Sequence, residues 1–320
     1  MDPLTDFLDG PRARNAFLLR VVMSPPWSID VSDGAPLTLV AVLRGHSWVT
    51  CDGAPPEELR QGDVLVVCGD APYLLSSALD LTPTVHIGGG QECSGPDGRD
   101  LETEMSAGVR TWGNDLDGDD ALLVGTFHSA GEVGRILLSS LPVNFVVRGD
   151  ENPMVSVLAS EVARDGIAQS SVLDRLLDLV LIQAVRSWSA ETQTDWLHGN
   201  RDPIIKKALK LIHERPDHPW SIETLASSVS ISRASLARRF HDSVGLPPIT
   251  YLTQWRLALA ADMLADPQLT LTAISQRVAY RSPFSFSTAF KKHYGVSPQT
   301  YRTTRTTSAT PSASAAQTRR

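Results

Sequence analysis

The chain has 320 residues, 42% of them hydrophobic, and carries 29 Lys and Arg against 36 Asp and Glu, so its formal net charge is −7. The length predicts about two domains, the hydrophobic content excludes a wholly disordered chain, and the negative charge argues against a nucleic-acid partner. That last inference requires evenly spread charge, but residues 1–200 carry 12 basic and 29 acidic side chains (net −17), whereas residues 201–320 carry 17 and 7 (net +10). We therefore expect an acidic module joined to a basic one.

Sequence patterns argue against several further classes of protein. The first residues lack the basic-then-apolar layout of a secretory signal, and no stretch approaches the roughly 18 uncharged apolar residues of a membrane span. Cys51, Cys68 and Cys93 are an odd number without a Cys-x-x-Cys pair, which indicates neither a disulfide framework nor a zinc cluster. We expect reduced thiols in a cytoplasmic protein that has no membrane partner.

Residues from about 15 to 150 have a strand-like pattern. Short apolar or β-branched runs are separated by turn signals such as Asp33-Gly34 and Asp52-Gly53. Strands at spacings of about 8–12 residues favour a sandwich or a barrel. The acidic, Gly-rich stretch from Gly113 to Asp120 is expected to be a solvated loop. The predicted strands are 17–22, 37–43, 47–51, 64–68 and 73–75.

The pattern becomes helical between residues 153 and 190. A broad apolar stripe extends from Leu173 to Trp188. In one interpretation these helices cover the barrel, and in the other the helix at 172–188 forms a homodimer interface. Residues 191–202 are expected to be a linker, and residues 303–320 contain too few large apolar side chains to fold.

The strongest pattern is an internal repeat in the basic module. Six residues recur at an offset of 50 positions, and each copy predicts a helix-turn-helix. The recurring pairs are Ser232 and Ser282, Leu236 and Phe286, Phe240 and Phe290, Gly245 and Gly295, Pro248 and Pro298, and Tyr251 and Tyr301.

Local signals support this interpretation of the two copies. Ser232 and Ser282 can cap the second helix of each copy, Pro283 suits a first helical position, and Gly245 and Gly295 can end these helices. Residues 251–264 predict one connecting helix about 21 Å long. A stiff connector of this size can hold two recognition helices in successive major-groove segments, about 34 Å apart along the duplex.

Residues across both copies also form a family signature. They are Trp220-Ser221-Ile222, Leu225-Ala226, Ser232, Leu236, Arg238, Phe240, Pro248, Tyr251, Arg256, Ile274, Ser282, Phe286, Phe290-Lys291, Gly295-Val296-Ser297-Pro298 and Tyr301-Arg302. With them, residues 203–302 resemble the AraC/XylS family of bacterial transcription regulators. The doubled signature is far more specific than a single helix-turn-helix, and it implies an all-α domain that binds operator DNA.

The resemblance places the base-reading positions of the first recognition helix at Ala234, Ala237 and Arg238. Arg238 is the best candidate for a bidentate contact with a guanine edge, and the alanine methyl groups could pack on thymine methyls or contribute nothing. Arg233 also faces outward. Arg239 is a candidate phosphate contact, with a solvated side chain as the alternative.

The second recognition helix departs from the family pattern. Thr288 stands where members usually carry Arg or Lys, and Ala279 stands where Gly is usual in the turn. The other outward residues, Pro283, Phe284 and Ser287, offer few hydrogen bonds. We therefore predict that this helix mainly holds the DNA backbone, because phosphate contacts fix the register without specifying bases. The predicted backbone contacts are Arg281, Lys291 and Lys292.

The acidic module contains a second, less specific set of matching segments. They are Asp2-Pro3-Leu4-Thr5-Asp6, Pro26-Trp27, Gly45-His46-Ser47-Trp48, Gly62-Asp63, Cys68-Gly69-Asp70-Ala71-Pro72-Tyr73, His86-Ile87-Gly88-Gly89-Gly90 and Leu173-Asp174-Arg175-Leu176. Over residues 1–190 the module resembles the cupin-like ligand-binding domains attached to one AraC branch.

The metal-binding residues of cupins are mostly replaced in this module. Cupins that bind metal hold the ion with a His-x-His pair, a Glu and a distant His, but here His46 stands alone and Tyr73 occupies the place of the distant His. His86 and His128 make a poor ligand set without a close carboxylate. We therefore expect no metal, no cofactor and no catalytic residues. The candidate pocket-lining residues are Trp27, Trp48, Tyr73, His86 and Cys93.

The expected architecture is a two-domain α+β chain. A cupin-like β-barrel with covering helices (1–190) serves regulation or dimerisation, a linker (191–202) follows, and an all-α double helix-turn-helix domain (203–302) precedes a disordered tail (303–320). The leading hypothesis is a sequence-specific transcription regulator that responds to a small molecule. The alternatives are a metal-dependent cupin enzyme fused to a DNA-binding module, an alkylation-repair protein, and a DNA-binding regulator without an effector.

The expected partners follow from the leading hypothesis. They are double-stranded operator DNA through its major groove, a small-molecule effector, a second copy of the chain through residues 172–188 and, for an activator, RNA polymerase.

Overall fold

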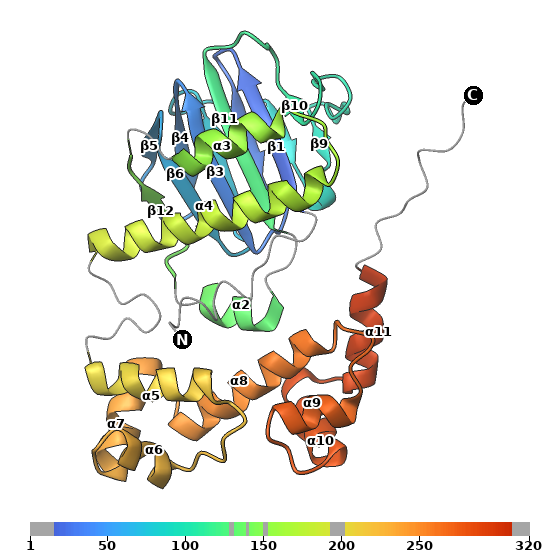
Figure 1. Cartoon of the computed structure of the whole chain (residues 1–320). Coiled ribbons are helices and arrows are strands. Elements are labelled where there is room, and N and C mark those ends of the chain that lie inside the picture. The colour runs from blue at the N-terminus through green and yellow to red at the C-terminus, as the bar shows by residue number, and fades with distance from the viewer. Residues whose placement is uncertain (1–15, 128–130, 139–140, 150–152, 193–201, 309–320) are drawn as a thin grey trace. The chain divides into compact units, whose positions relative to one another are not determined.

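The computed structural model describes residues 16–127, 131–138, 141–149, 153–192 and 202–308. These residues divide into two units (Figure 1). The N-terminal unit contains the described residues of 16–192 apart from 131–134, and the C-terminal unit contains 131–134 and 202–308. His128 and most of the predicted linker lie outside the described residues.

Two six-stranded sheets form the body of the N-terminal unit. Most neighbouring strands are antiparallel, and the pairs β1–β10 and β2–β8 are parallel. In hydrogen-bonded order, the first sheet is β10 (Thr111–Trp112), β1 (Phe17–Met23), β11 (Asp120–Phe127), β3 (Leu37–Arg44), β6 (Val64–Cys68) and β12 (Asn144–Val147). The second is β5 (Glu57–Arg60), β4 (His46–Cys51), β7 (Tyr73–Ser76), β2 (Ser28–Val31), β8 (Val85–Ile87) and β9 (Cys93–Ser94).

The two sheets share one hydrophobic core. Val21 and Val40 of the first sheet pack in the same cluster as Ile29 and Val49 of the second. This confirms a sheet-rich N-terminal domain, but the sheets stay open instead of closing into the predicted barrel. All five predicted strands are present, each within one residue of its predicted ends.

Asp120 corrects part of the loop prediction. Residues 113–119 have no strand structure, but Asp120 begins β11 and is only 2% exposed. Its carboxylate accepts hydrogen bonds from Trp27 Nε1 at 2.8 Å and from the backbone N–H of His46 at 3.1 Å. A buried carboxylate with two donors is satisfied, so Asp120 is a structural residue.

Two helices cover the first sheet, as the first interpretation of the helical segment predicts. Helices α3 (Pro153–Val162) and α4 (Gln169–Thr192) lie across its outer face in Figure 1. The approach of α4 is close enough that a Cβ at Gly125 of β11 would meet the Leu177 side chain at 2.5 Å. A further helix, α2 (Gly131–Leu138), and a short turn, η1 (Gly89–Gln91), complete the elements before residue 193. No helix in the described part of the chain is long and apolar enough to cross a membrane.

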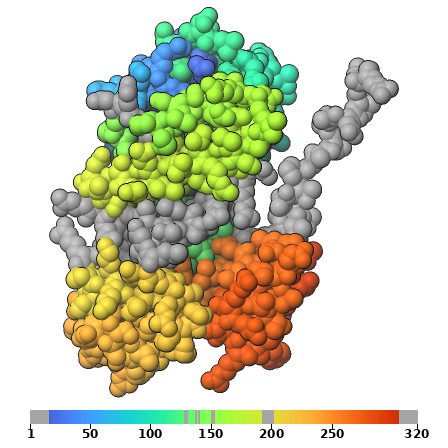
Figure 2. All heavy atoms as spheres, viewed as in Figure 1, coloured from blue at the N-terminus to red at the C-terminus, as the bar shows by residue number. Residues whose placement is uncertain are grey.

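Seven helices make up the main part of the C-terminal unit among its described residues. They are α5 (Pro203–Glu214), α6 (Ile222–Ser228), α7 (Arg233–Val244), α8 (Pro248–Met263), α9 (Leu271–Arg277), α10 (Pro283–Tyr294) and α11 (Pro298–Ser308). Within this unit, the repeat produces the lobes drawn in gold and orange in Figure 2, with α8 between them in the sequence.

The predicted caps of the repeat are present. The side chains of Ser232 and Ser282 accept hydrogen bonds from backbone N–H groups three residues later, at the starts of α7 and α10. Gly245 and Gly295 end these helices in the left-handed conformation, with φ of 76° and 77°. Local capping by serine side chains and by glycine therefore fixes where both recognition helices begin and end.

Two boundaries differ from prediction. Helix α8 begins at Pro248, because proline is well suited to the first helical turn, and not at residue 251. Helix α11 continues through residues 303–308 of the predicted tail. There the hydroxyls of Thr303 and Thr304 donate hydrogen bonds to helix carbonyls four residues earlier. Composition alone does not reveal these local hydrogen bonds.

Candidate nucleic-acid interface and effector pocket

Helix α7 presents one apolar and one polar face. Leu236 and Phe240 are fully buried, whereas Arg233, Ala234 and Arg238 are exposed. The predicted base-reading residue Ala237 is half-buried. The structure thus brings the predicted readers to one side of a helix whose opposite side is anchored in the core.

The three arginines of α7 have different surroundings. Arg233 forms an ion pair with Glu223 of α6 at 2.8 Å, and this guanidinium lowers the pKa of Glu223 to about 2. Arg239 Nε lies 2.5 Å from the carboxylate of Asp202, which also caps α5. Arg238 is exposed and has no ion pair or hydrogen bond among the residues that the structure describes. Its guanidinium is therefore available to a ligand.

An aromatic cluster behind α7 was not predicted. His213 of α5 is 5% exposed, and its Nε2 lies 2.8 Å from the Tyr251 hydroxyl. Its ring stacks on the ring of Trp255, with 4.0 Å between the two ring centroids. Phe240 of α7 meets Tyr251 edge-on at 5.7 Å. The cluster links α5, α7 and α8; Phe240 and Tyr251 belong to the repeat, whereas His213 was not singled out in the sequence.

Arg256 also has a role that sequence patterns do not reveal. Its Nε donates to the carbonyl of Pro216 at 2.6 Å, and its terminal nitrogen donates to the carbonyl of His218 at 2.7 Å. These bonds fix the segment that leads into α6. The residue belongs to the support of the first helix-turn-helix and not to its outward face.

The outward face of α10 differs from that of α7. Phe284 is 82% exposed, and the Thr288 hydroxyl donates to the Phe284 carbonyl at 3.0 Å. Pro283 and Ser287 are half-buried. The predicted backbone contacts are all exposed: Arg281 lies just before the helix, and Lys291 and Lys292 lie in its last turn.

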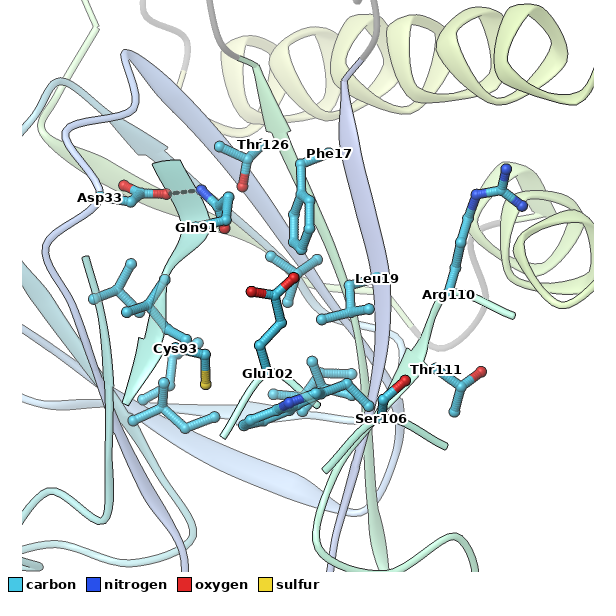
Figure 3. A pocket seen from close by; sticks show the side chains of 18 of the residues that line it. Phe17, Leu19, Asp33, Gln91, Cys93, Glu102, Ser106, Arg110, Thr111 and Thr126 are labelled. Carbon is cyan, nitrogen blue, oxygen red and sulfur yellow. Dashed lines mark hydrogen bonds between the residues drawn. The ribbon is translucent and has the colours of Figure 1, made fainter. Parts of the chain in front are cut away.

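A cavity of about 380 Å³ opens between the two sheets of the N-terminal unit (Figure 3). Tyr73 and Cys93 line it, but Trp27, Trp48 and His86 do not. Trp27 is buried in the core through its bond to Asp120, and Trp48 and His86 alternate with inward residues on their strands. The remaining lining includes residues that were not predicted: Phe17, Leu19, Asp33, Gln91, Glu102, Arg110 and Trp112.

The histidines considered as metal ligands and set aside in the sequence do not converge within the described residues. His86 Nδ1 lies 3.1 Å from Asp30, and His46 Nδ1 lies 4.0 Å from Asp120. Within the described ranges, no three His, Cys, Asp or Glu side chains are grouped closely enough to hold a metal ion.

All three thiols are buried. Burial raises the pKa of Cys68 to about 12, and burial together with Asp100 and Glu102 raises that of Cys93 to about 11. These thiols are therefore protonated at neutral pH and are poor nucleophiles. The alkylation-repair alternative requires a reactive acceptor cysteine, so the burial of these thiols argues against it.

Comparisons with known proteins agree with both units. Residues 2–190 match the family described as Cupin, and residues 225–304 match the family described as Helix-turn-helix domain. A putative AraC-like transcription regulator of Streptomyces antibioticus is 30% identical over 94% of this chain and 98% of its own length. The HTH-type transcriptional regulator AlkR of Acinetobacter baylyi is 28% identical over 94% and 99%. The solved DNA-binding domain of AdpA, in complex with a target DNA, is 26% identical, covers 34% of this chain and 96% of its own, and has a TM-score of 0.32.

Proposed function

Because the chain belongs to the AraC-like family of transcription regulators, we propose that its two helix-turn-helix units bind operator DNA in successive major-groove segments while its cupin domain senses a small molecule. The named relatives are regulators, so the chain is a DNA-binding regulator and not an enzyme. We place its action in the cytoplasm, where operator DNA lies.

The assignment of base reading to α7 and backbone contact to α10 rests on the guanidinium of Arg238, which has no partner among the described residues. Arg233 and Arg239 are held by carboxylates, so base recognition by α7 rests on Arg238, which can donate two hydrogen bonds to a guanine edge. The exposed methyl group of Ala234 leaves room for a base beside it.

Helix α10 is proposed to hold the DNA backbone. Arg281, Lys291 and Lys292 carry charge toward phosphates, while Thr288 already uses its hydroxyl proton within the helix. Phosphate contacts of this kind add affinity that falls with salt and do not distinguish bases.

The test uses the full chain and an operator selected from randomised DNA, followed by binding to single-base variants of that operator. Arg238→Ala is expected to lose about 1–3 kcal/mol of discrimination at one base pair, because a bidentate contact disappears. Thr288→Ala is expected to leave discrimination unchanged.

Lys292→Ala is the matched control for a phosphate contact. It should weaken binding to all sequences alike and reduce the slope of log affinity against log salt by about one. Equal losses of discrimination in Arg238→Ala and Thr288→Ala would contradict the assignment.

A second copy of the chain and, for activation, RNA polymerase are further proposed partners. The support for a dimer is a pair of exposed apolar side chains on α4, Val172 (40% exposed) and Leu179 (46% exposed), because most of the apolar stripe that suggested an interface is buried. These residues are seven positions apart, so they share one face of the helix. A shallow hollow lined by Met154, Leu179 and Ile182 lies beside them.

A further inference from the structure

The cavity between the sheets has an apolar body. Side chains from both sheets contribute to it, including three aromatic rings, those of Phe17, Tyr73 and Trp112. Trp112 has its indole N–H bonded to the Leu101 carbonyl at 3.1 Å, so it offers only ring surface to a ligand. A volume of about 380 Å³ is within the range of about 300–1,000 Å³ that is typical of small-molecule sites.

One carboxylate extends into this apolar body. Figure 3 shows Glu102 pointing into the cavity, toward Phe17 and between Leu19 and Cys93. In the described part of the chain, the Glu102 carboxylate has no ion pair or hydrogen bond. Glu104, two residues later, is paired with Arg99 at 3.3 Å. The Glu102 side chain is exposed, so its charge is accessible to solvent and to a ligand.

The other charged lining residues do not neutralise Glu102. Arg110 points away from the cavity in Figure 3, and its guanidinium donates to the carbonyl of Arg164 at 3.4 Å. Asp33 accepts hydrogen bonds from Gln91 Nε2 at 2.6 Å and from the backbone N–H of Ala35 at 3.0 Å. Cys93 stays a neutral thiol at pH 7. The lining is therefore mostly apolar, and the charge that faces the cavity is negative.

This arrangement selects ligands by charge. A neutral or anionic molecule that filled the cavity would remove water from the Glu102 carboxylate and give it no counter-charge. Desolvation of an ionised group without such a partner is costly. A metal ion would meet Glu102, the already hydrogen-bonded Asp33 and mostly carbon, whereas hard cations require about six oxygen ligands. An organic cation replaces the lost hydration and buries its apolar part against the rings.

We propose that this cavity binds an organic cation with an apolar body, such as an aromatic or alkyl ammonium compound, with Glu102 as its counter-ion. This assignment rests on the proposed effector role of the cupin domain and names the chemical class of the effector. The aromatic surface comes from Phe17, Tyr73 and Trp112. Glu102 distinguishes cationic ligands from neutral and anionic ones.

The test is calorimetric titration of the full chain with three probes of similar size. They are benzyltrimethylammonium, its neutral carbon isostere neopentylbenzene, and the anion 4-tert-butylbenzoate. The cation is expected to bind most tightly. Glu102→Gln should weaken binding of the cation roughly tenfold, because the counter-charge disappears while the shape of the side chain remains.

Glu104→Gln is the matched control and should change the affinity for the cation less than about twofold, because Glu104 is paired outside the cavity. Thermal unfolding of both variants checks that the N-terminal unit stays folded. If the neutral or anionic probe binds as tightly as the cation, or if Glu102→Gln leaves cation binding unchanged, the ligand class is wrong while the effector role stands. If none of the probes binds, the cation class is overturned. The DNA-binding function is tested separately by the operator experiments above, which do not depend on any ligand of the cavity.

Discussion

At the scale of single residues, function in this chain depends on which charged groups are already paired. Arg233, Arg238 and Arg239 are alike in sequence, and only the positions of Glu223 and Asp202 distinguish them. The partners lie 10 and 37 residues from their arginines, beyond the reach of a local pattern. Glu102 and Glu104 also differ only in their pairing, because only Glu104 meets a cation.

Asp120 provides a residue-scale prediction. Its carboxylate is buried and accepts from Trp27 and His46, so Asp120→Ala leaves a buried indole N–H without a partner. We expect the free energy of unfolding to fall by about 2–4 kcal/mol, measured by calorimetry of the full chain as a lower midpoint for the N-terminal unit. Asp119→Ala, at the exposed neighbouring position, should change it by less than about 0.5 kcal/mol. Similar effects of the two substitutions would refute the structural role of Asp120.

At the scale of elements, long apolar runs and capped helices could be predicted, and short polar strands could not. The run at residues 64–68 is buried at every position and was evident from composition. Strands such as β5 (Glu57–Arg60) consist mainly of charged residues, and β9 and β10 have two residues each, so only pairing with a neighbour makes them strands. Most of the cavity lining was missed for the same reason, because the segments that form it come together only through that pairing.

The turn of the second helix-turn-helix supports an element-scale prediction. Ala279 has a φ of 58°, a left-handed conformation that strains a residue with a Cβ. Ala279→Gly should therefore stabilise α9 and α10 by about 0.5–1 kcal/mol, net of the entropy that glycine adds to the unfolded chain. Hydrogen exchange of the amides in these helices measures this local stability.

The opposite substitution at a neighbouring cap gives the comparison. Gly295 has a φ of 77° and open space where a Cβ would lie, so Gly295→Ala tests strain without a clash. We expect it to destabilise α10 by about 1 kcal/mol. Faster exchange in Ala279→Gly would show that this turn is not strained.

At the scale of the whole molecule, charge is divided between the two parts of the chain. The net charge of +10 belongs to residues 201–320, which contain the repeated helix-turn-helix, and the net charge of −17 belongs to residues 1–200. Operator DNA therefore favours docking through the C-terminal unit alone. A dimer through α4 would double the number of such units on one operator.

Leu179→Glu tests that dimer. A carboxylate placed in an apolar interface is buried without a partner, so the substitution should shift the full chain to the monomer, measured by analytical ultracentrifugation. Leu116→Glu makes the same change at a leucine that is 55% exposed on a loop and should leave the association state unchanged. A wild-type chain that is monomeric at all accessible concentrations would rule out the interface.

Helix α8 has a consequence for the organisation of promoters. Its 16 residues form one continuous rod, about 24 Å long, between the two recognition helices. Each base pair inserted into the operator rotates one half-site by about 34° relative to the other. A rigid rod cannot follow that rotation, so a single insertion or deletion between the half-sites should be as harmful as the loss of a contacted base. The operators of this regulator should then tolerate substitutions in the spacer between half-sites but not changes in its length.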